Sequence, residues 1–288
     1  MRISGFTFVR NGIVYDYPFR ESICSVLPLV DEFIVNIPYS DDKTYEAVLE
    51  IGSPKIKIFQ TEWNGDIPSG GKILSHHTNL ALKKCTGDWC FYIQADEVIH
   101  ENDHPKIKSA MENNLNDKKI DGLLFDYLHF YGSYNCVASS RTWYRNEVRI
   151  VRNNPDIVSF DDAQGFRFTS GGKLNVVSTG ARVFHYGWVR PIESMRIKKI
   201  AMDRLWHGNK MDEENRNLEY SSTQYGLKEY NGTHPSVMKE RIKKQDWQFV
   251  YNPRVSSYRE LRYWFSDILE RITGKRFFEY KGYNRVKD

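Results

Sequence analysis

Apolar residues follow two spacings in residues 1–100, and these spacings predict strands and helices in alternation. Runs of strand type lie at 3–9, 32–37, 55–60 and 89–94. The helical positions between these runs are Phe19, Ile23, Val26, Leu27 and Val30, then Ala47, Val48 and Ile51, then Leu74, Thr78, Ala81, Leu82 and Cys85. Repeated strand–helix units with short connections predict an α/β fold with a doubly wound, mostly parallel sheet.

The remainder of the chain has a less regular pattern. Its predicted elements are a strand at 121–131, a polar and aromatic connection at 134–144, a strand at 147–153, a hairpin-like turn or loop at 164–178, a helix at 192–207 and a polar surface excursion at 209–235. The glycine pair Gly171-Gly172 is the reason for the turn or loop.

A last helix is predicted at 258–273, with an apolar face on one side. That face consists of Tyr258, Leu261, Phe265, Ile268, Leu269 and Ile272, and the basic residues around it are Arg259, Arg262, Arg271, Lys275 and Arg276. Such a helix either docks onto the core or rests on an anionic membrane surface, and the sequence leaves both options open.

Composition excludes several classes of protein. Apolar residues make up 40% of the 288 residues, which is enough for a sizeable core, and the net charge of +4 permits an anionic partner without a basic block of nucleic-acid type. No run of about 18 apolar residues predicts a membrane span. The N-terminus lacks the pattern of a signal peptide, and Cys24, Cys85, Cys90 and Cys136 lack metal-ligand or disulfide spacing. We therefore expect a cytoplasmic protein.

Two adjacent carboxylates follow the predicted strand at 89–94. Polar groups at the carboxyl end of a buried strand face the crevice in which open α/β sheets bind ligands, and Asp96 and Glu97 stand at that point. Carboxylates there suit a hard divalent cation, which commonly bridges a nucleotide diphosphate. A strand followed by an ordinary polar turn is the alternative.

Several short motifs follow one another in residues 8–97. They are Phe8-Val9-Arg10-Asn11, Leu29-Val30-Asp31-Glu32-Phe33-Ile34-Val35-Asn36, Ser40-Asp41-Asp42-Lys43-Thr44, Asn79-Leu80-Ala81-Leu82, Gly87-Asp88-Trp89 and Gln94-Ala95-Asp96-Glu97. Two later segments are Trp143-Tyr144-Arg145-Asn146-Glu147-Val148-Arg149 and His185-Tyr186-Gly187-Trp188-Val189-Arg190-Pro191. With these motifs in this order, the chain resembles family 2 glycosyltransferases over about residues 3–190, which are inverting, nucleotide-sugar-dependent enzymes of the GT-A fold. The two later segments are similar to a bacterial branch of this family that makes surface glycans.

The resemblance implies a domain organisation. Residues 1–190 would form the GT-A core, with a nucleotide-binding half at 1–100 and an acceptor half at 101–190. Residues 191–288 would form a helical C-terminal extension.

The resemblance also implies a metal site for Mn²⁺ or Mg²⁺. Asp96 matches the last acid of the family's DxD-type motif, Glu97 follows it, and His185 matches a late histidine that completes the metal shell in many such enzymes. The first acid of the motif is replaced by Gln94, whose amide adds no charge. A purely structural histidine is the alternative for His185.

Contacts to the donor, UDP- or GDP-linked, are implied for a further set of residues. They are Arg10, Asn11, Asn36, Asp42, Asn79, Gln94, Asp96, Tyr186, Trp188 and Arg190. For Asp42 a helix-capping role, and for Asn79 a plain surface position, are the alternatives. Arginine binds phosphate bidentately, which is the reason for including Arg190.

An inverting transfer requires a general base for the acceptor hydroxyl. The family supplies a carboxylate from the region after the sheet, and Asp162 is the first candidate here, with Asp161 next and Glu147 in reserve. The neighbours of Glu147, Arg145 and Arg149, indicate a structural ion pair instead.

The resemblance implies transfer of a sugar to a glycan or lipid-linked acceptor in surface polysaccharide or lipopolysaccharide biosynthesis. The Gln-x-x-Arg-Trp signature of processive polymer synthases is missing from the sequence, which favours the transfer of a single sugar. A non-catalytic nucleotide- or glycan-binding protein with the same fold is the alternative, and Gln94 favours it. A sugar nucleotidyltransferase would need a glycine-rich loop after the first strand, and a dinucleotide-dependent oxidoreductase would need G-x-G-x-x-G there. The chain has neither. Peripheral contact with the inner membrane surface is a further hypothesis.

Overall fold

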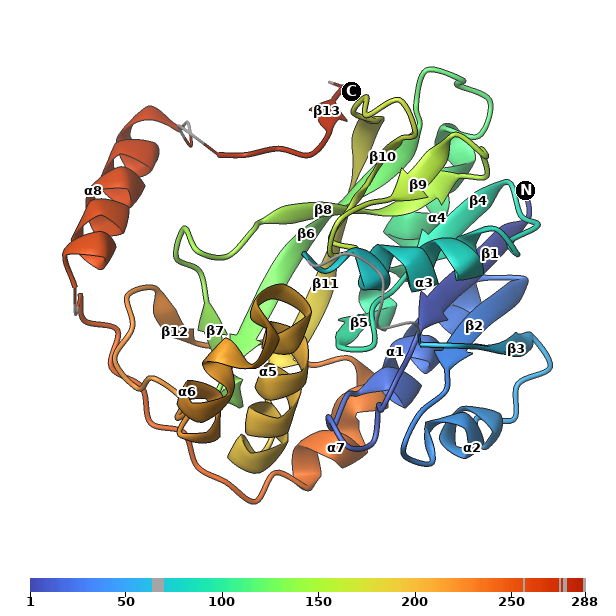
Figure 1. Cartoon of the computed structure of the whole chain (residues 1–288). Helices are drawn as coiled ribbons and strands as arrows, with labels where there is room; N and C mark the ends of the chain where they lie inside the picture. The colour runs from blue at the N-terminus through green and yellow to red at the C-terminus, as the bar shows by residue number, and fades with distance from the viewer. Residues whose placement is uncertain (64–69, 256, 275, 277–278, 287–288) are drawn as a thin grey trace.

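Four parallel strands form the N-terminal part of the central sheet. A computed structural model of the chain describes residues 1–63, 70–255, 257–274, 276 and 279–286. The strands are β1 (Ile3–Phe8), β2 (Glu32–Pro38), β3 (Ile56–Thr61) and β4 (Trp89–Tyr92), in the order β3-β2-β1-β4. The helices between them are α1 (Phe19–Val26), α2 (Thr44–Leu49) and α3 (Lys72–Leu82) (Figure 1). The predicted α/β class with a doubly wound parallel sheet is confirmed.

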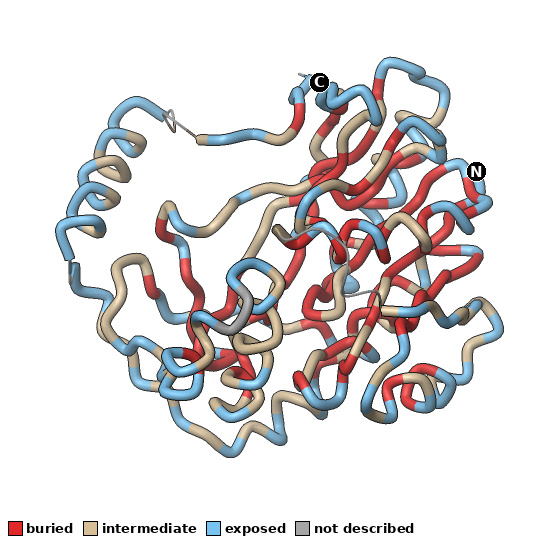
Figure 2. The backbone as a smooth tube through the Cα atoms, viewed as in Figure 1, coloured by how far each residue is buried: buried red, intermediate tan, exposed pale blue. Residues whose placement is uncertain are grey.

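The parallel strands are buried because helices cover them. All residues of β2 are buried, and Phe19, Ile23 and Val26 of α1 belong to the same apolar core cluster as Phe33 and Val35 of β2. Figure 2 shows that the buried positions concentrate along the strands of the sheet. Central parallel strands are shielded on both faces and therefore consist of nearly continuous apolar runs, as in β2 and β4. The helical and strand spacings of residues 1–100 thus identify elements that the core requires.

The second half of the sheet is mixed. Its strands are β5 (Glu97–Ile99), β6 (Gly122–Tyr131), β7 (Ser133–Ala138), β8 (Asn146–Arg152), β11 (Asn175–Trp188), β12 (Leu227–Glu229) and β13 (Asn284–Arg285). β8 joins the two halves, because it pairs antiparallel with both β4 and β6. β11 runs parallel to β6 and antiparallel to β5, so β5 and the residues before it are held against the centre of the molecule. A separate hairpin consists of β9 (Ile157–Ser159) and β10 (Phe166–Phe168).

Helices and short turns complete the chain. The helices are α4 (His104–Asn113), α5 (Ile192–His207), α6 (Asp212–Arg216), α7 (Lys239–Lys243) and α8 (Tyr258–Thr273), and the 3₁₀ turns are η1 (Leu27–Leu29), η2 (Glu101–Asp103), η3 (Gly208–Met211) and η4 (Ser236–Met238). The predicted helices at 192–207 and 258–273 are confirmed. No helix in the described part of the chain is both long and apolar enough to span a bilayer.

Two segments differ from the sequence prediction. Residues 134–144 were expected to be a connection but include most of β7, and 164–178 include β10 and the start of β11. β7 mixes polar and aromatic residues, and five of its six residues are buried. Its sequence therefore lacks the alternation of apolar and polar positions that identifies a half-exposed strand. β11 carries Gly180 at φ +65°, where its register with β6 shifts, and this bulge interrupts the period-2 pattern.

The C-terminal residues add to the same sheet. β12 pairs with β7, and β13 pairs with β11. Arg241 of α7 forms ion pairs with Asp16 and Glu21 at the opposite end of the chain. The division into a core at 1–190 and an extension at 191–288 stays a prediction.

Glu32 ties the N-terminal strands together and gives a testable consequence. Its buried carboxylate accepts hydrogen bonds from Ser4 Oγ (2.7 Å), Thr86 N (2.9 Å) and Lys57 Nζ (2.6 Å). Burial alone would raise the pKa of Glu32, but these hydrogen bonds lower it to about 2. The stabilisation is therefore present above the ordinary value of 4.5 and is lost as the pH falls through about 2.

We expect Glu32→Gln to lower the free energy of unfolding at pH 7 by about 1–3 kcal/mol, because the hydrogen bonds from Ser4, Thr86 and Lys57 would lose their charged acceptor. Urea unfolding at pH 7 and pH 3 measures this, and the variant should lose less stability than the wild type on acidification. Glu50→Gln, at an exposed ion pair with Arg20, is the matched control. Equal acid sensitivity in wild type and Glu32→Gln would contradict the assignment.

Candidate active site

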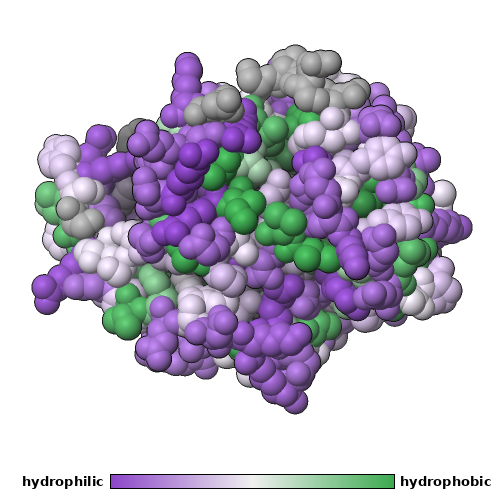
Figure 3. Space-filling model, turned by 60° about the horizontal axis from the view of Figure 1, so that its bottom comes forward, coloured by the Kyte–Doolittle hydropathy of each residue, from purple (hydrophilic) through white to green (hydrophobic). Residues whose placement is uncertain are grey.

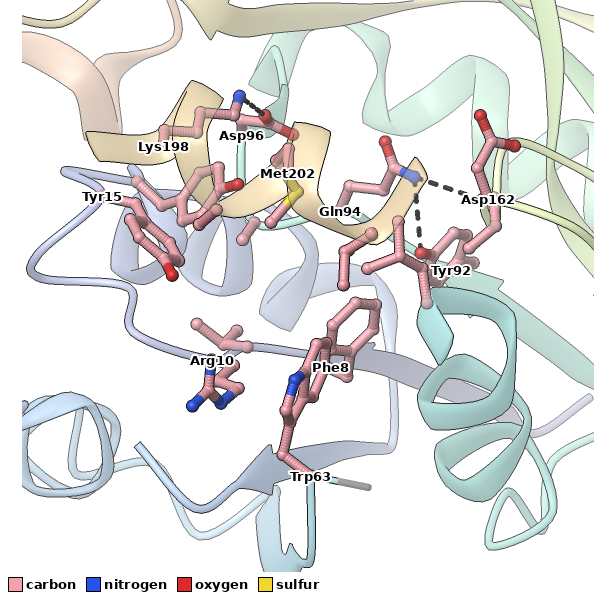
Figure 4. A pocket seen from close by; sticks show the side chains of 17 residues that line it. Phe8, Arg10, Tyr15, Trp63, Tyr92, Gln94, Asp96, Asp162, Lys198 and Met202 are labelled. Atoms are coloured by element: carbon pink, nitrogen blue, oxygen red, sulfur yellow. Dashed lines mark hydrogen bonds and ion pairs between the residues drawn. The ribbon is translucent and has the colours of Figure 1, made fainter. Parts of the chain in front are cut away.

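A cavity of about 240 Å³ lies at the carboxyl ends of β1 and β4. Because neighbouring parallel strands end at the same sheet edge, the residues that follow them meet there. The cavity is lined by Phe8, Val9, Arg10, Tyr15, Tyr17, Trp63, Leu74, Tyr92, Gln94, Ala95, Asp96, Asp162, Ala163, Lys198, Ala201, Met202 and Leu205 (Figure 4). The last four come from α5, which covers the cavity from the side opposite the strands.

One face of the molecule combines polar and apolar character. On the face that looks out from the bottom of Figure 1, apolar side chains gather near the middle, and hydrophilic side chains surround them (Figure 3). An apolar area bordered by polar groups is typical of a binding surface.

Asp96 forms an ion pair with Lys198 at one end of the cavity. Lys198 Nζ lies 3.2 Å from Asp96 Oδ2 and donates to the carbonyl oxygen of Gly187 at 2.9 Å. Burial alone would raise the pKa of Asp96, but the nearby charges, that of Lys198 above all, hold it well below its usual range. Burial and the nearby Arg190 lower the pKa of Lys198 to about 8. At pH 7 the pair therefore consists of a carboxylate and an ammonium.

His185 approaches the same carboxylate from β11. Its Nε2 lies 3.8 Å from Asp96 Oδ1, and its Nδ1 lies 2.8 Å from Nδ1 of His129. Burial lowers the pKa of His185 to about 4 and that of His129 to about 3, so both imidazoles are neutral at pH 7. His129 Nε2 donates to the carbonyl oxygen of Tyr144 at 2.7 Å, which makes His129 Nδ1 an acceptor for His185 Nδ1–H. His185 Nε2 is thereby left as an acceptor that faces Asp96.

Glu97 is placed differently from Asp96. Its side chain is fully buried and accepts from Arg149 Nη2 at 2.7 Å, Arg149 Nε at 2.9 Å, Tyr127 Oη at 2.6 Å and the backbone N–H of Gln94 at 3.0 Å. Glu97 does not line the cavity. It could bind a cation there only if this ion pair opened.

Gln94 connects the end of β4 to the loop that carries Asp162. Its Nε2 donates to the carbonyl oxygen of Ala163 at 3.2 Å and lies 3.5 Å from Tyr92 Oη (Figure 4). Asp161 and Ala163 have φ angles of +47° and +62°, so the chain turns sharply around Asp162. Asp162 lines the cavity, and burial raises the pKa of its carboxyl above its usual range.

The other two candidates for a general base lie elsewhere. Asp161 is exposed and does not line the cavity. Glu147 lines a separate cavity of about 750 Å³ beside α8, where it accepts from Gln164 Nε2 at 2.7 Å and burial raises its pKa to about 7. Asp162 is thus the candidate that shares a cavity with Asp96.

The aromatic end of the cavity lies opposite Lys198. The guanidinium of Arg10 lies 4.8 Å from the ring centre of Trp63, and the Trp63 ring stacks on His77 at 4.9 Å with an interplanar angle of 7°. Buried Asn36 holds His77 from behind, because its amide donates to the His77 carbonyl oxygen at 3.0 Å. Asn36 therefore supports the cavity wall without lining it.

Three further predicted donor contacts have partners within the fold. Asn11 exchanges two hydrogen bonds with Asp41, Asp42 accepts from the backbone of Ile13, Val14 and Thr44, and Asn79 exchanges two hydrogen bonds with the backbone of Ser159. None of these three residues lines the cavity.

The three later candidates on and after β11 support the cavity from behind. Tyr186 Oη lies 2.8 Å from His234 Nδ1, and Trp188 packs against Tyr131. Arg190 is fully buried; it donates to the carbonyl oxygens of Tyr15 and Gly187, and its guanidinium lies 4.8 Å from the ring centre of Tyr17. Among the described residues its Nε has no hydrogen-bond partner.

The sequence prediction missed several lining residues, including Tyr15, Tyr17, Trp63 and Lys198. A signal for the last was present in the predicted helix at 192–207. Lys198, Ala201, Met202 and Leu205 follow i, i+3, i+4, i+7 spacing and share one helix face, so Lys198 had to lie on the side of the helix that packs inward.

Comparisons with known proteins find partial similarity. No protein-family model matches the chain. A TPR repeat-containing protein of Synechococcus elongatus is 28% identical over 135 residues, which are 47% of this chain and 28% of that protein. The chain therefore spans less than a third of the curated relative.

Solved structures are similar over part of the fold. S. aureus TarS aligns with a TM-score of 0.44 and 17% identity, over 75% of this chain and 41% of that one. TarS 1–349 in complex with UDP-GlcNAc aligns at 0.43 and 15%, over 75% and 69%. Glucosyl-3-phosphoglycerate synthase from Mycobacterium tuberculosis, in complex with Mn²⁺, UDP and phosphoglyceric acid, aligns at 0.31 and 20%, over 44% and 43%. All three TM-scores lie below 0.5, so these similarities assign no activity to the chain.

The Glu97–Arg149 pair makes a prediction about stability. We expect Arg149→Met to lower the free energy of unfolding by about 3–5 kcal/mol, because it leaves a buried carboxylate without its partner. Adding Glu97→Gln to this variant should recover a large part of the loss. Urea unfolding of the two variants and the wild type measures both effects.

Arg145→Met is the control, since Arg145 forms a partly exposed ion pair with Glu270 and its loss should cost at most about 1 kcal/mol. Equal losses for Arg149→Met and Arg145→Met would show that the buried pair contributes nothing special.

Proposed function

We propose that this chain is a glycosyltransferase that moves one sugar from a UDP- or GDP-linked donor to a glycan or lipid-linked acceptor, with inversion at the anomeric carbon. One observation carries the proposal. The cavity at the carboxyl ends of β1 and β4 has an aromatic end at Trp63, a cationic end at Lys198 and a carboxylate, Asp162, in its wall.

Each part of the cavity matches one part of a nucleotide-sugar. At the aromatic end, Trp63 packs on His77 and the Arg10 guanidinium lies over the Trp63 ring, so a base entering here would meet aromatic and guanidinium surfaces on which it can stack. The diphosphate fits the end where Lys198 and, behind it, Arg190 supply positive charge. The sugar would then extend along the wall that carries Gln94 and Asp162.

The chemistry assigned to this site is a single displacement. Asp162 accepts the proton of the acceptor hydroxyl while the oxygen of that hydroxyl bonds to the anomeric carbon. At the same time, the bond between the anomeric carbon and the diphosphate oxygen breaks. The nucleoside diphosphate leaves with the electron pair of that bond. Burial raises the pKa of Asp162, which strengthens its carboxylate as a base.

The predicted Mn²⁺ or Mg²⁺ does not fit the residues well. Asp96 and His185 Nε2 are suitable ligand atoms, but Gln94 replaces the first acid, Glu97 is engaged by Arg149, and Lys198 already neutralises Asp96. No cluster of three metal-ligating side chains occurs among the described residues. The metal role of Asp96, Glu97 and His185 stays a prediction, and no step here depends on it.

A non-catalytic nucleotide- or glycan-binding protein is the second candidate. Gln94 favours it, because this amide stands where the family has an acid and is tied to Ala163 and Tyr92 within the fold. Such a protein would bind the nucleotide and transfer nothing.

Nucleotide binding tests the proposed function first. We expect the thermal midpoint of the wild type to rise with one of UDP, GDP, CDP and dTDP, because a ligand that binds only the folded state stabilises it. The preferred base then identifies the donor for a transfer assay. A midpoint unchanged by every nucleotide would contradict the proposal.

The base is tested by Asp162→Asn with that donor. The variant should bind the nucleotide as the wild type does and lose about 10²–10⁴-fold in kcat. Asp161→Asn tests the other candidate, and Asp156→Asn, at an exposed position of the same region, is the control. Wild-type kcat in Asp162→Asn would remove this residue from the mechanism.

We also propose that α8 contacts an anionic membrane surface. Its acidic side faces the protein: Glu260 accepts from the backbone N–H of Tyr225 at 3.0 Å, Asp267 accepts from Tyr225 Oη at 2.7 Å, and Glu270 accepts from Arg145. Its apolar side is exposed at Tyr258, Leu261, Trp264, Phe265, Leu269 and Ile272, and the arginines beside that face are Arg259, Arg262 and Arg271. A helix with this arrangement fits a bilayer interface better than water. Residues 275, 277 and 278, which belong to the predicted segment, lie outside the described residues.

Liposome flotation checks this. The wild type should float with vesicles that contain phosphatidylglycerol and less with phosphatidylcholine alone, because arginines attract anionic lipid. Replacing Phe265 and Ile272 by Ser should abolish flotation, whereas Val250→Ser, which changes an exposed apolar residue outside α8, should not. Equal flotation of all variants would contradict the role of α8.

A further inference from the structure

Lys198 contacts the carboxylate that the sequence predicts to be a metal ligand. Its ammonium contacts the outer oxygen of Asp96 at 3.2 Å and the carbonyl oxygen of Gly187 at 2.9 Å, and it lies 5.0 Å from the ring centre of Tyr17. The side chain is 14% exposed, and it lines the cavity from α5 (Figure 4). An ammonium has three N–H donors. Two have acceptors in the fold, so the third is available to a ligand in the cavity.

The charges around Lys198 already favour an anion. Lys198 and Arg190 both lie over the Tyr17 ring, and one carboxylate, that of Asp96, contacts Lys198, so this end holds two basic side chains and one acidic side chain. Among the described residues, Asp96 is the only carboxylate paired with Lys198, and Arg190 has no carboxylate partner. A divalent cation bound here would lie beside the basic side chains of Lys198 and Arg190, and Asp96 would be the single carboxylate beside all three.

The acids that could correct this balance are committed elsewhere. Gln94 is neutral, and both oxygens of Glu97 accept from Arg149, whose side chain is as fully buried as its partner. His185 Nε2, 3.8 Å from Asp96 Oδ1, would add an imidazole nitrogen and no further carboxylate. The residues at this end therefore suit a site in which the cation is the ammonium group of Lys198 and not a bound metal ion.

We propose that the ammonium of Lys198, supported by Arg190, takes the place of a divalent cation in binding the donor's diphosphate, so that nucleotide binding requires no metal. The inference rests on the proposed function and deepens it, because it names the group that neutralises the leaving diphosphate. Asp96 then acts as a positioning residue: it holds the lysine at the cavity wall.

The helix that carries Lys198 suits this role. Lys198 shares a face with Ala201, Met202 and Leu205, and Leu205 accepts a hydrogen bond from the backbone N–H of Gly70 at 3.2 Å. This bond links α5 to the residues just before α3, and Asp96 and the Gly187 carbonyl oxygen hold the ammonium itself. A fixed ammonium at a leaving group stabilises the developing negative charge without reorganisation.

The test measures binding of the nucleoside diphosphate by isothermal titration calorimetry, in EDTA and in Mn²⁺. The proteins are the wild type, Lys198→Met, Lys198→Arg, the charge-neutral pair Lys198→Met with Asp96→Asn, and Lys199→Met. The neutral pair guards against loss of folding, since it leaves no unpaired buried carboxylate. Lys199, the next residue on α5, pairs with Asp203 and is the matched control.

We expect the wild type to bind as tightly in EDTA as in Mn²⁺. Lys198→Met and the neutral pair should bind about 10–100-fold more weakly in EDTA, the equivalent of one hydrogen bond to a charged group. Lys198→Arg should keep most of the affinity, and Lys199→Met all of it.

Other results would overturn the inference. Wild-type binding that is lost in EDTA and restored by Mn²⁺ would show that a metal ion displaces the lysine, and the proposed function would stand. Unchanged binding of Lys198→Met in EDTA would also reject the lysine. A wild type that binds no nucleotide in either condition would reject the proposed function together with the inference.

Discussion

The elements around the cavity are fixed to one another by the buried ion pair between Glu97 and Arg149. Glu97 begins β5, Arg149 lies on β8, and Tyr127, a third member of the group, lies on β6. Arg149 also donates to the carbonyl oxygen of Gln164, in the loop that follows Asp162. One guanidinium and one carboxylate thus join three strands and the loop of the candidate base. Burial of both charges is tolerable because nearly every donor and acceptor has a partner.

This arrangement separates two adjacent acids. Asp96 faces the cavity and Glu97 faces the interior, since neighbouring residues at the start of a strand point to opposite sides. The sequence placed both at the carboxyl end of a strand, and that much is right. Glu97 is turned to the interior by its ion pair with Arg149, which lies 52 residues away along the chain, and no local sequence pattern identifies such a partner.

Local periodicity was sufficient for the elements of residues 1–100 and for α5 and α8, because each of them carries a single apolar stripe or a continuous apolar run. It was insufficient for β7 and β11, whose burial is set by neighbours on both sides and by the bulge at Gly180. The site shows the same division. Asp96, Asp162, Gln94 and Arg10 line the cavity, whereas Asn11 and Asp42 bind neighbouring loop residues and Asn79 binds the backbone of β9. Lys198 was missed because it enters from a helix that begins after the last motif.

α5 lies in the last third of the chain, so it is synthesised long after the strands that form the rest of the cavity. The parallel strands β1 to β4 are formed by the first third of the chain and can associate as soon as they have been synthesised. The wall made by Lys198, Met202 and Leu205 follows about a hundred residues later. During synthesis, the sheet edge with Asp96 is therefore made before its counter-charge, and a ribosome-bound chain that ends before α5 has the stacking surface but no closed cavity.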